Sequence, residues 1–139
     1  MTYGECKEKI KDLGFEENST MAEYSSIVRN AIQRATQFIF DDMVIKHTAY
    51  YKRELSMDGY EWEAVRPAFI TESTKDESVI DLPDNVVELV PLLASYYVWL
   101  DDDITKATMY WNAYEAHRTE IGNSCLRMVK ATITGGLRW

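Results

Sequence analysis

The stretch WLDDDITKATMYW, residues 99–111, places three consecutive aspartates between two runs of bulky apolar side chains. A calcium loop needs oxygen ligands at alternating positions, a glycine at its turn and a distal glutamate. The contiguous Asp101, Asp102 and Asp103 are followed instead by Ile104 and Thr105, so that pattern fails. An N-cap role for Asp102 or Asp103, with the remaining carboxylates near the positive end of the helix dipole, explains all three. The stretch predicts a corner where one helix ends and the next begins.

Both sides of this corner carry helical patterns. The preceding segment opens at Pro83 and Asp84, which suit the first turn of a helix, and Pro91 predicts a kink or local break near residues 87–91. The following helix is predicted to run to Gly122-Asn123, and its apolar face consists of Ile104, Ala107, Trp111, Tyr114 and Ile121. We expect the aromatic residues of the two helices to pack against each other in the core; they are Tyr96, Tyr97, Trp99, Tyr110, Trp111 and Tyr114.

The N-terminal part predicts two further helices. Thr2 and Glu5 form a capping-box pattern, and Gly14 is a natural helix end. A second such pair, Thr20 and Glu23, opens a longer amphipathic helix from about residue 21 into the forties. Its apolar face consists of Tyr24, Ile27, Val28, Ala31, Ile32, Ala35, Phe38 and Ile39. We expect Phe38 on this face to be buried, and also Trp111 on the apolar face of the helix that follows the aspartate triplet.

In the middle of the chain, the apolar residues no longer follow helical spacing. Asp58-Gly59 is a two-residue hairpin signal that would pair Met57 with Tyr60 and Leu55 with Trp62. Residues 66–81 read as a polar loop with short extended pieces. The predicted fold is therefore mainly α: a helical bundle of about four helices with a small β-hairpin or extended segment in the middle. Residues 1–139 are expected to form one domain, with residues 122–139 as a C-terminal extension.

Composition limits the classes of function. The chain has 139 residues and a formal charge of −8, which argues against binding of nucleic acid through its phosphates. Cys6 and Cys125 have no CxxC spacing, and we expect reduced thiols in a protein made in the cytoplasm. The N-terminus lacks the apolar core of a signal peptide, and the most apolar segment, residues 86–100, is too short to cross a bilayer.

Motifs for catalysis are not found in the sequence. His47 and His117 are the two histidines, and neither belongs to an E-x-x-H or H-E-x-x-H pattern. Gly135-Gly136 follows no strand and does not form a phosphate-binding loop. We predict no enzymatic activity, no cofactor and no metal site. Two alternatives stay open: a small helical regulator that binds another protein, and a ligand-binding or enzymatic bundle that uses the aromatic series with His117.

A family resemblance covers most of the chain, from the long amphipathic helix through the middle to the helix after the aspartate triplet. LPDNVVELV opens a helix that contains Ala94, Tyr96 and Tyr97, and an acidic turn leads to Lys106, Ala107, Tyr110 and Tyr114. With these motifs, and over roughly residues 20–121, the chain resembles the head–tail adaptor (connector) proteins of tailed double-stranded DNA bacteriophages. The resemblance implies a helical structural protein of the virion neck, present in the virion after synthesis in the host cytoplasm. It also implies a homo-oligomeric ring, monomeric subunits when free, that binds the portal protein and the next neck or tail protein and lets DNA pass without specific binding.

The last eight residues, TITGGLRW at 132–139, carry the predicted interaction site. Ile133 sits between two threonines in a strand-like alternation, and two glycines then precede Leu137, Arg138 and Trp139. Trp and Arg are enriched at interface hot spots, and glycines leave a terminus mobile. We expect this segment to dock on the portal or an adjacent subunit and to become ordered only on assembly. The alternative is a frayed end that folds back onto its own bundle.

Overall fold

The computed structural model describes residues 1–15 and 23–136, with side chains through residue 129. Most of this part of the chain is helical, which confirms the mainly α fold. The elements are, in order, α1 (Tyr3–Gly14), α3 (Ser25–Ile39), η1 (Phe40–Val44), η2 (Ile45–His47), α4 (Thr48–Leu55), α5 (Asp84–Val87), α6 (Leu89–Trp99) and α7 (Ile104–Gly136).

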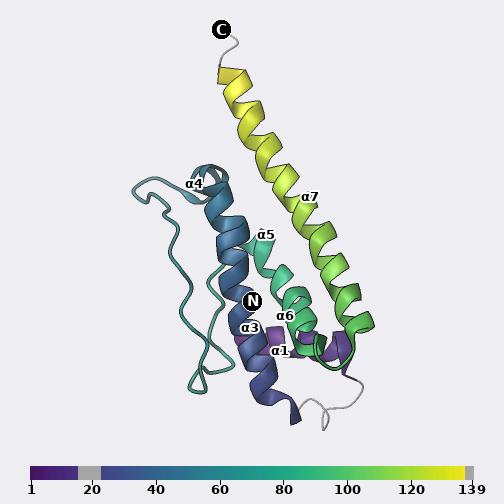
Figure 1. Cartoon of the computed structure of the whole chain (residues 1–139). Helices are drawn as coiled ribbons and strands as arrows, with labels where there is room; N and C mark the ends of the chain where they lie inside the picture. Colours follow the sequence, from purple (N-terminus) through teal and green to yellow (C-terminus); the bar gives the residue numbers. More distant parts are fainter. Residues whose placement is uncertain (16–22, 137–139) are drawn as a thin grey trace.

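Helix α6 is the centre of the bundle. It packs against α3 on one side and α7 on the other, while α1 crosses near its lower end (Figure 1). Because neighbours cover it on several sides, apolar side chains occupy nearly its whole circumference. Its buried residues are Leu89, Val90, Pro91, Leu93, Ala94, Ser95 and Val98.

The aspartate triplet forms the predicted corner. Helix α6 ends at Trp99 and α7 begins at Ile104. The Asp103 carboxylate accepts a hydrogen bond from the backbone N–H of Lys106 at 3.1 Å, and the Asp103 carbonyl accepts one from Ala107 at 2.9 Å. Asp103 therefore caps α7, which confirms the capping interpretation. Within residues 1–15 and 23–136, no group of three or more His, Cys, Asp or Glu side chains is arranged to hold a metal ion.

The start and end of α1 and the break near Pro91 also agree with the predicted helix boundaries. The Thr2 hydroxyl accepts a hydrogen bond from the backbone N–H of Glu5 at 3.1 Å, and α1 ends at Gly14 as predicted. The break near Pro91 is confirmed, since α5 ends at Val87 and α6 starts two residues later. Pro91 thus lies in the first turn of α6, where a missing N–H costs no helical hydrogen bond. Thr20 lies outside the described residues.

The long amphipathic helix continues further than predicted. After α3 the chain passes through the π-turn η1 and the short η2 before α4 ends at Leu55. A π-turn inserts one extra residue into a helical path and changes which side chains face the core beyond it. Phe40, Met43 and Val44 are buried here, and Asp42 points toward α7.

The predicted β-hairpin is wrong. Asp58-Gly59 does form a tight turn, in which Met57 and Tyr60 exchange backbone hydrogen bonds of 2.9 and 2.8 Å and Gly59 has φ +80°. Leu55, however, is the last residue of α4 and cannot pair with Trp62. The N–H of Trp62 donates instead to the Ser56 hydroxyl at 3.0 Å. Its ring packs 5.8 Å from that of Tyr51 in α4, so burial of Trp62 against a helix replaces strand pairing.

Residues 56–83, which we call the arm, run extended along α3 and return past α1 (Figure 1). Side chains of α3 hold the outgoing pass: Gln33 accepts from the Ile70 N–H at 2.7 Å, and Gln37 donates to the Pro67 carbonyl at 3.0 Å. The returning pass bonds to the N-terminus, with the Tyr3 N–H donating to the Ser78 carbonyl at 2.8 Å. These hydrogen bonds satisfy backbone groups of the arm that, in a β-strand, would bond to a neighbouring strand.

Two burial predictions are corrected by the structure. Phe38 is 40% exposed, because it lies at the edge of α3 and covers Tyr114 edge-on at 6.4 Å instead of entering the core. Trp111 is only partly buried, with its ring between those of Tyr96 and Tyr114. Tyr114 is the aromatic side chain of α7 that the core encloses completely.

Helix α7 does not end at Gly122-Asn123. It continues to Gly136, so residues 122–136 belong to the same helix as residues 104–121. A glycine inside a helix costs about 1 kcal/mol relative to alanine. The packed residues on either side, Ile121 and the buried Cys125, outweigh this cost.

Gly14 marks a close approach between α1 and the α6–α7 corner. Lys106 Nζ donates to the Gly14 carbonyl at 2.6 Å, and the Tyr110 hydroxyl donates to the Leu13 carbonyl. A Cβ atom on Gly14 would lie 2.7 Å from Trp99 Nε1 and 3.1 Å from the Tyr110 hydroxyl. Two α7 side chains thus satisfy the C-terminal carbonyls of α1, and a side chain at Gly14 would separate them.

We therefore expect Gly14→Ala to lower the free energy of unfolding by about 1–2 kcal/mol through overpacking. Urea titration followed by circular dichroism measures this change. Gly122→Ala is the matched control, because a Cβ there meets its nearest atom, His47 Nε2, at 3.4 Å. That control should be neutral or stabilising, since alanine favours a helix interior. Equal effects of the two substitutions would contradict the close approach.

Candidate functional site

Asp42 is the centre of a charged cluster that ties α7 to the π-turn. Its carboxylate accepts hydrogen bonds from Arg118 Nη2 at 3.0 Å and from Arg118 Nε. It also accepts from the Tyr114 hydroxyl and from Lys46 Nζ, each at 3.1 Å. The π-turn places Asp42 toward α7, and Tyr114 and Arg118 lie one helical turn apart on α7.

The cluster holds fixed charges. Burial alone would raise the pKa of Asp42, but the hydrogen bonds from Arg118 and Lys46 lower it to about 2. The hydrogen bond to Asp42 raises the pKa of Arg118, while burial and the same carboxylate raise that of Tyr114. None of the three groups changes its protonation near neutral pH, so the cluster fastens α7 and is not suited to proton transfer.

The aromatic series packs between helices, but of its six rings only those of Tyr110 and Tyr114 are buried, and the other four are partly buried. The Trp111 ring lies 5.1 Å from Tyr96 and 5.5 Å from Tyr114, and the Arg34 guanidinium stacks 4.2 Å from the Tyr97 ring. Trp99 is covered by Lys106, whose Nζ lies 3.8 Å from the ring centroid. The rings therefore contact one another and nearby cations inside the bundle.

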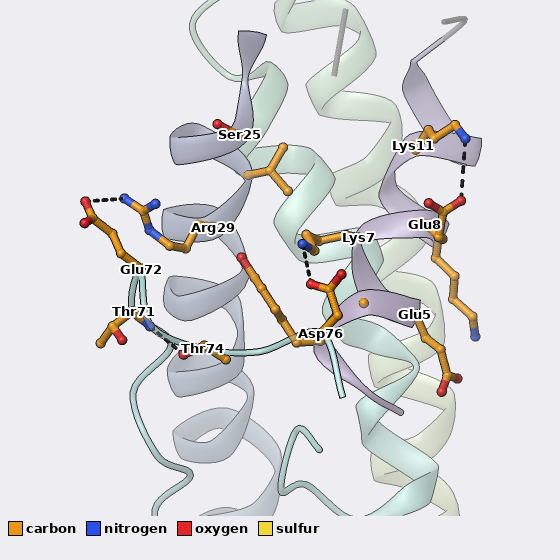
Figure 2. A pocket seen from close by; sticks show the side chains of 14 residues that line it. Glu5, Lys7, Glu8, Lys11, Ser25, Arg29, Thr71, Glu72, Thr74 and Asp76 are labelled. Atoms are coloured by element: carbon orange, nitrogen blue, oxygen red, sulfur yellow. Dashed lines mark hydrogen bonds and ion pairs between the residues drawn. The ribbon is translucent and has the colours of Figure 1, made fainter. Parts of the chain in front are cut away.

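A wide groove lies between α1, the start of α3 and residues 71–76 of the arm (Figure 2). Its volume is about 980 Å³. Its cations face carboxylates across short distances: Lys7 to Asp76 at 2.7 Å, Arg29 to Glu72 at 3.7 Å and Lys11 to Glu8 at 3.5 Å. These pairs neutralise the charges that an ionic ligand would need, and two of them attach the arm to the helices.

His117 lies at a smaller hollow. With Tyr50, Asn85, Glu120 and Ser124, among others, it lines a space of about 340 Å³ between α4, α5 and α7. Cys125 lies close by, since Asn85 Nδ2 is 3.9 Å from its sulfur. This is the place where a His/Cys pair would have to act.

The thiols are not activated. Both cysteines are free and buried. Burial raises the pKa of Cys125, and it raises that of Cys6 to about 12. The thiolate is the reactive form, so both are poor nucleophiles at neutral pH. His47 is on η2, where burial lowers its pKa, and a Cβ atom added at Gly122 would lie 3.4 Å from its Nε2.

A third depression, which we call the acidic groove, lies between α4, α5 and the arm. Its volume is about 510 Å³, and aromatic rings contribute much of its wall, with Tyr51 5.1 Å from Tyr50 and 5.8 Å from Trp62. Among the described residues that line it, all the charged ones are carboxylates: Glu54, Glu63, Asp81 and Asp84. Sequence reasoning missed this groove, because its residues come from three elements whose meeting no local pattern indicates.

Of the predicted interaction residues, Ile133 belongs to the last part of α7. The helix extends past α4, where Arg53 Nη1 donates to the Met128 carbonyl at 2.9 Å (Figure 1). Ile133 belongs to this helical segment, so the strand-like interpretation of residues 132–134 is wrong. Leu137, Arg138 and Trp139 lie outside the described residues.

Other apolar side chains are exposed on the arm and on α7. Val65 and Phe69 are each 67% exposed, and Leu126 of α7 is 59% exposed. Among the described helices, none combines the length and apolar character needed to cross a bilayer.

Comparison with known proteins gives no match. No family model matches the chain, no curated protein is significantly similar to it, and no solved structure matches it significantly.

Proposed function

We propose that the chain is a head–tail adaptor of a tailed double-stranded DNA bacteriophage, which assembles as a ring on the portal and extends the DNA channel toward the tail. The observation that carries the proposal is α7, a 33-residue helix that leaves the bundle and carries residues 129–136 away from the body (Figure 1). A protruding helix gives each subunit a means of contacting another protein. The sequence resemblance supports the same function.

Charge and surface chemistry support the proposal further. A net charge of −8 suits a conduit for DNA, because phosphate contacts with Lys and Arg supply most non-specific affinity. The exposed Val65 and Phe69 on the arm suit burial between subunits in an assembly. In this function DNA passes without specific binding, no cofactor is needed, and the partners are the portal and the next neck or tail protein.

Electron microscopy of the protein mixed with the cognate portal tests the function. We expect rings docked on the portal with wild-type protein and undecorated portals when residues 137–139 are deleted. The deletion should leave the melting temperature of the isolated protein unchanged within about 2 °C, because three residues that follow two glycines near a terminus are expected to contribute little to stability. Bare portals with the wild-type protein would contradict the adaptor function. Normal decoration by the truncated protein would show that residues 137–139 are not needed for assembly of the ring on the portal.

The exposed arm also favours a second candidate, a small helical regulator that binds another protein. Val65 and Phe69 are available for such a partner as well as for a neighbouring subunit. A gene beside portal or major capsid genes favours the adaptor. For a regulator, we expect a defined complex with one non-virion protein and no portal decoration.

A further inference from the structure

The acidic groove has the composition of a binding site for a cationic and aromatic segment. Its four carboxylates line the groove together with the rings of Tyr50, Tyr51 and Trp62. Asp81 and Asp84 form no ion pair with residues in the described part of the chain, whereas the cations of the wide groove in Figure 2 are paired. Carboxylates next to aromatic faces bind a guanidinium strongly, because the charge and the planar stacking surface are both satisfied.

The chain itself contains a segment of the complementary chemistry. Leu137-Arg138-Trp139 offers an apolar side chain, a guanidinium and an indole in succession. The arm, residues 56–83, contains seven acidic and two basic residues, a net charge of −5. Residues 127–139 contain Arg127, Lys130 and Arg138 and no acidic residue. The two surfaces are therefore complementary in charge and in apolar character.

The segment cannot reach the groove of its own subunit. Helix α7 passes α4 at Met128, and the eight further helical residues to Gly136 carry the backbone about 12 Å beyond that point. Arg138 follows Gly136 by two residues, which span at most about 7 Å when fully extended. Returning to a groove beside α4 and α5 needs more chain than this, so the occupant comes from another copy.

We infer that the acidic groove binds Leu137-Arg138-Trp139 of a second copy of this chain, with Arg138 on the carboxylates of Asp81 and Asp84 and Trp139 on the aromatic wall. This inference rests on the proposed ring function and assigns a contact within the ring. The donor segment and the acceptor groove are different surfaces, so the contact is heterologous. A heterologous contact propagates from subunit to subunit and closes into a ring when the rotation permits.

Fluorescence anisotropy with a labelled synthetic peptide of residues 131–139, titrated with the full-length protein, tests the contact. We expect saturable binding that weakens at least tenfold for the Asp81→Asn/Asp84→Asn double variant and for a peptide carrying Arg138→Glu. A peptide carrying Trp139→Ala should also lose at least tenfold. The matched control is Asp12→Asn/Glu77→Gln, which removes two exposed carboxylates that do not line the acidic groove and should leave the affinity unchanged.

Charge reversal gives a second measurement that does not depend on loss of binding. Asp84→Arg should bind the Arg138→Glu peptide more tightly than the wild-type peptide, and thermal melting checks that each variant is folded. Absence of saturable binding, or equal loss in the control variant, would overturn the inference. Peptide binding and portal docking are measured separately. Docked rings without peptide binding overturn only the groove assignment, and peptide binding with bare portals overturns only the adaptor function.

Discussion

Replacing Tyr114 with alanine should lower the free energy of unfolding by about 4 kcal/mol. Tyr114 is fully buried on α7, and its ring packs 5.5 Å from Trp111 and 6.4 Å from Phe38. The substitution leaves a cavity at the junction of α3, α6 and α7 and also removes a donor to Asp42. Urea or thermal unfolding followed by circular dichroism measures the loss.

The conservative substitution Tyr114→Phe separates packing from hydrogen bonding. It keeps the ring and removes one hydrogen bond to Asp42, so we expect a loss of only about 1 kcal/mol. Trp111→Ala should cost less than Tyr114→Ala, since Trp111 is only partly buried. If Trp111→Ala is the more damaging of the two, the assignment of Tyr114 as the enclosed aromatic residue is wrong.

Replacing Asp42 with alanine should cost about 3 kcal/mol at neutral pH, because Arg118 loses its partner in a partly buried site. The loss should depend on pH. Asp42 has a folded pKa of about 2, below its ordinary value of 3.8, so its contribution to stability is present above about pH 4 and is lost as the pH falls through 2. The difference in unfolding free energy between wild type and variant should therefore shrink between pH 5 and pH 2.

Asp41→Asn is the matched control for Asp42. Asp41 is the adjacent carboxylate and pairs with Arg66 at 2.6 Å, but more than half of its side chain is exposed. An exposed pair contributes less than about 1 kcal/mol. Unfolding of both variants by urea at pH 7 and at pH 2.5 makes the comparison. A pH-independent difference between wild type and Asp42→Ala would show that the carboxylate charge does not hold α7 in place.

Local sequence signals predicted the parts of the fold that depend on few residues. The Thr2–Glu5 cap, the Asp103 corner and the break before Pro91 each follow from backbone hydrogen bonding within one turn. The amphipathic face of residues 24–39 was predicted from the helical spacing of its apolar residues, which is also a local signal. Ile27 and Phe38 at the edges of this face are exposed.

The features that were missed depend on contacts between distant segments. Asp58-Gly59 forms its turn, but Trp62 packs on Tyr51 of α4, a contact that the hairpin pattern does not contain. Gly122 was predicted as a helix end because glycine often ends a helix. The packing of Ile121 and Cys125, which continues the helix past it, is not visible in the sequence. The acidic groove requires α4, α5 and the arm to meet, so neither its carboxylates nor its rings were identified as a site.

The length of α7 also has a mechanical consequence. Its 33 residues make a rod about 50 Å long, and the Asp103 corner, the Gly14 contact and the Asp42–Arg118 pair all hold its first half. Such a rod acts as a lever with its pivot in the bundle. Gly136 lies 22 residues, or about 33 Å, beyond Tyr114, so a tilt of about 5° there moves the tip by roughly 3 Å. A sub-ångström repacking near Tyr114 is thereby amplified into a displacement large enough to make or break a contact at Gly136.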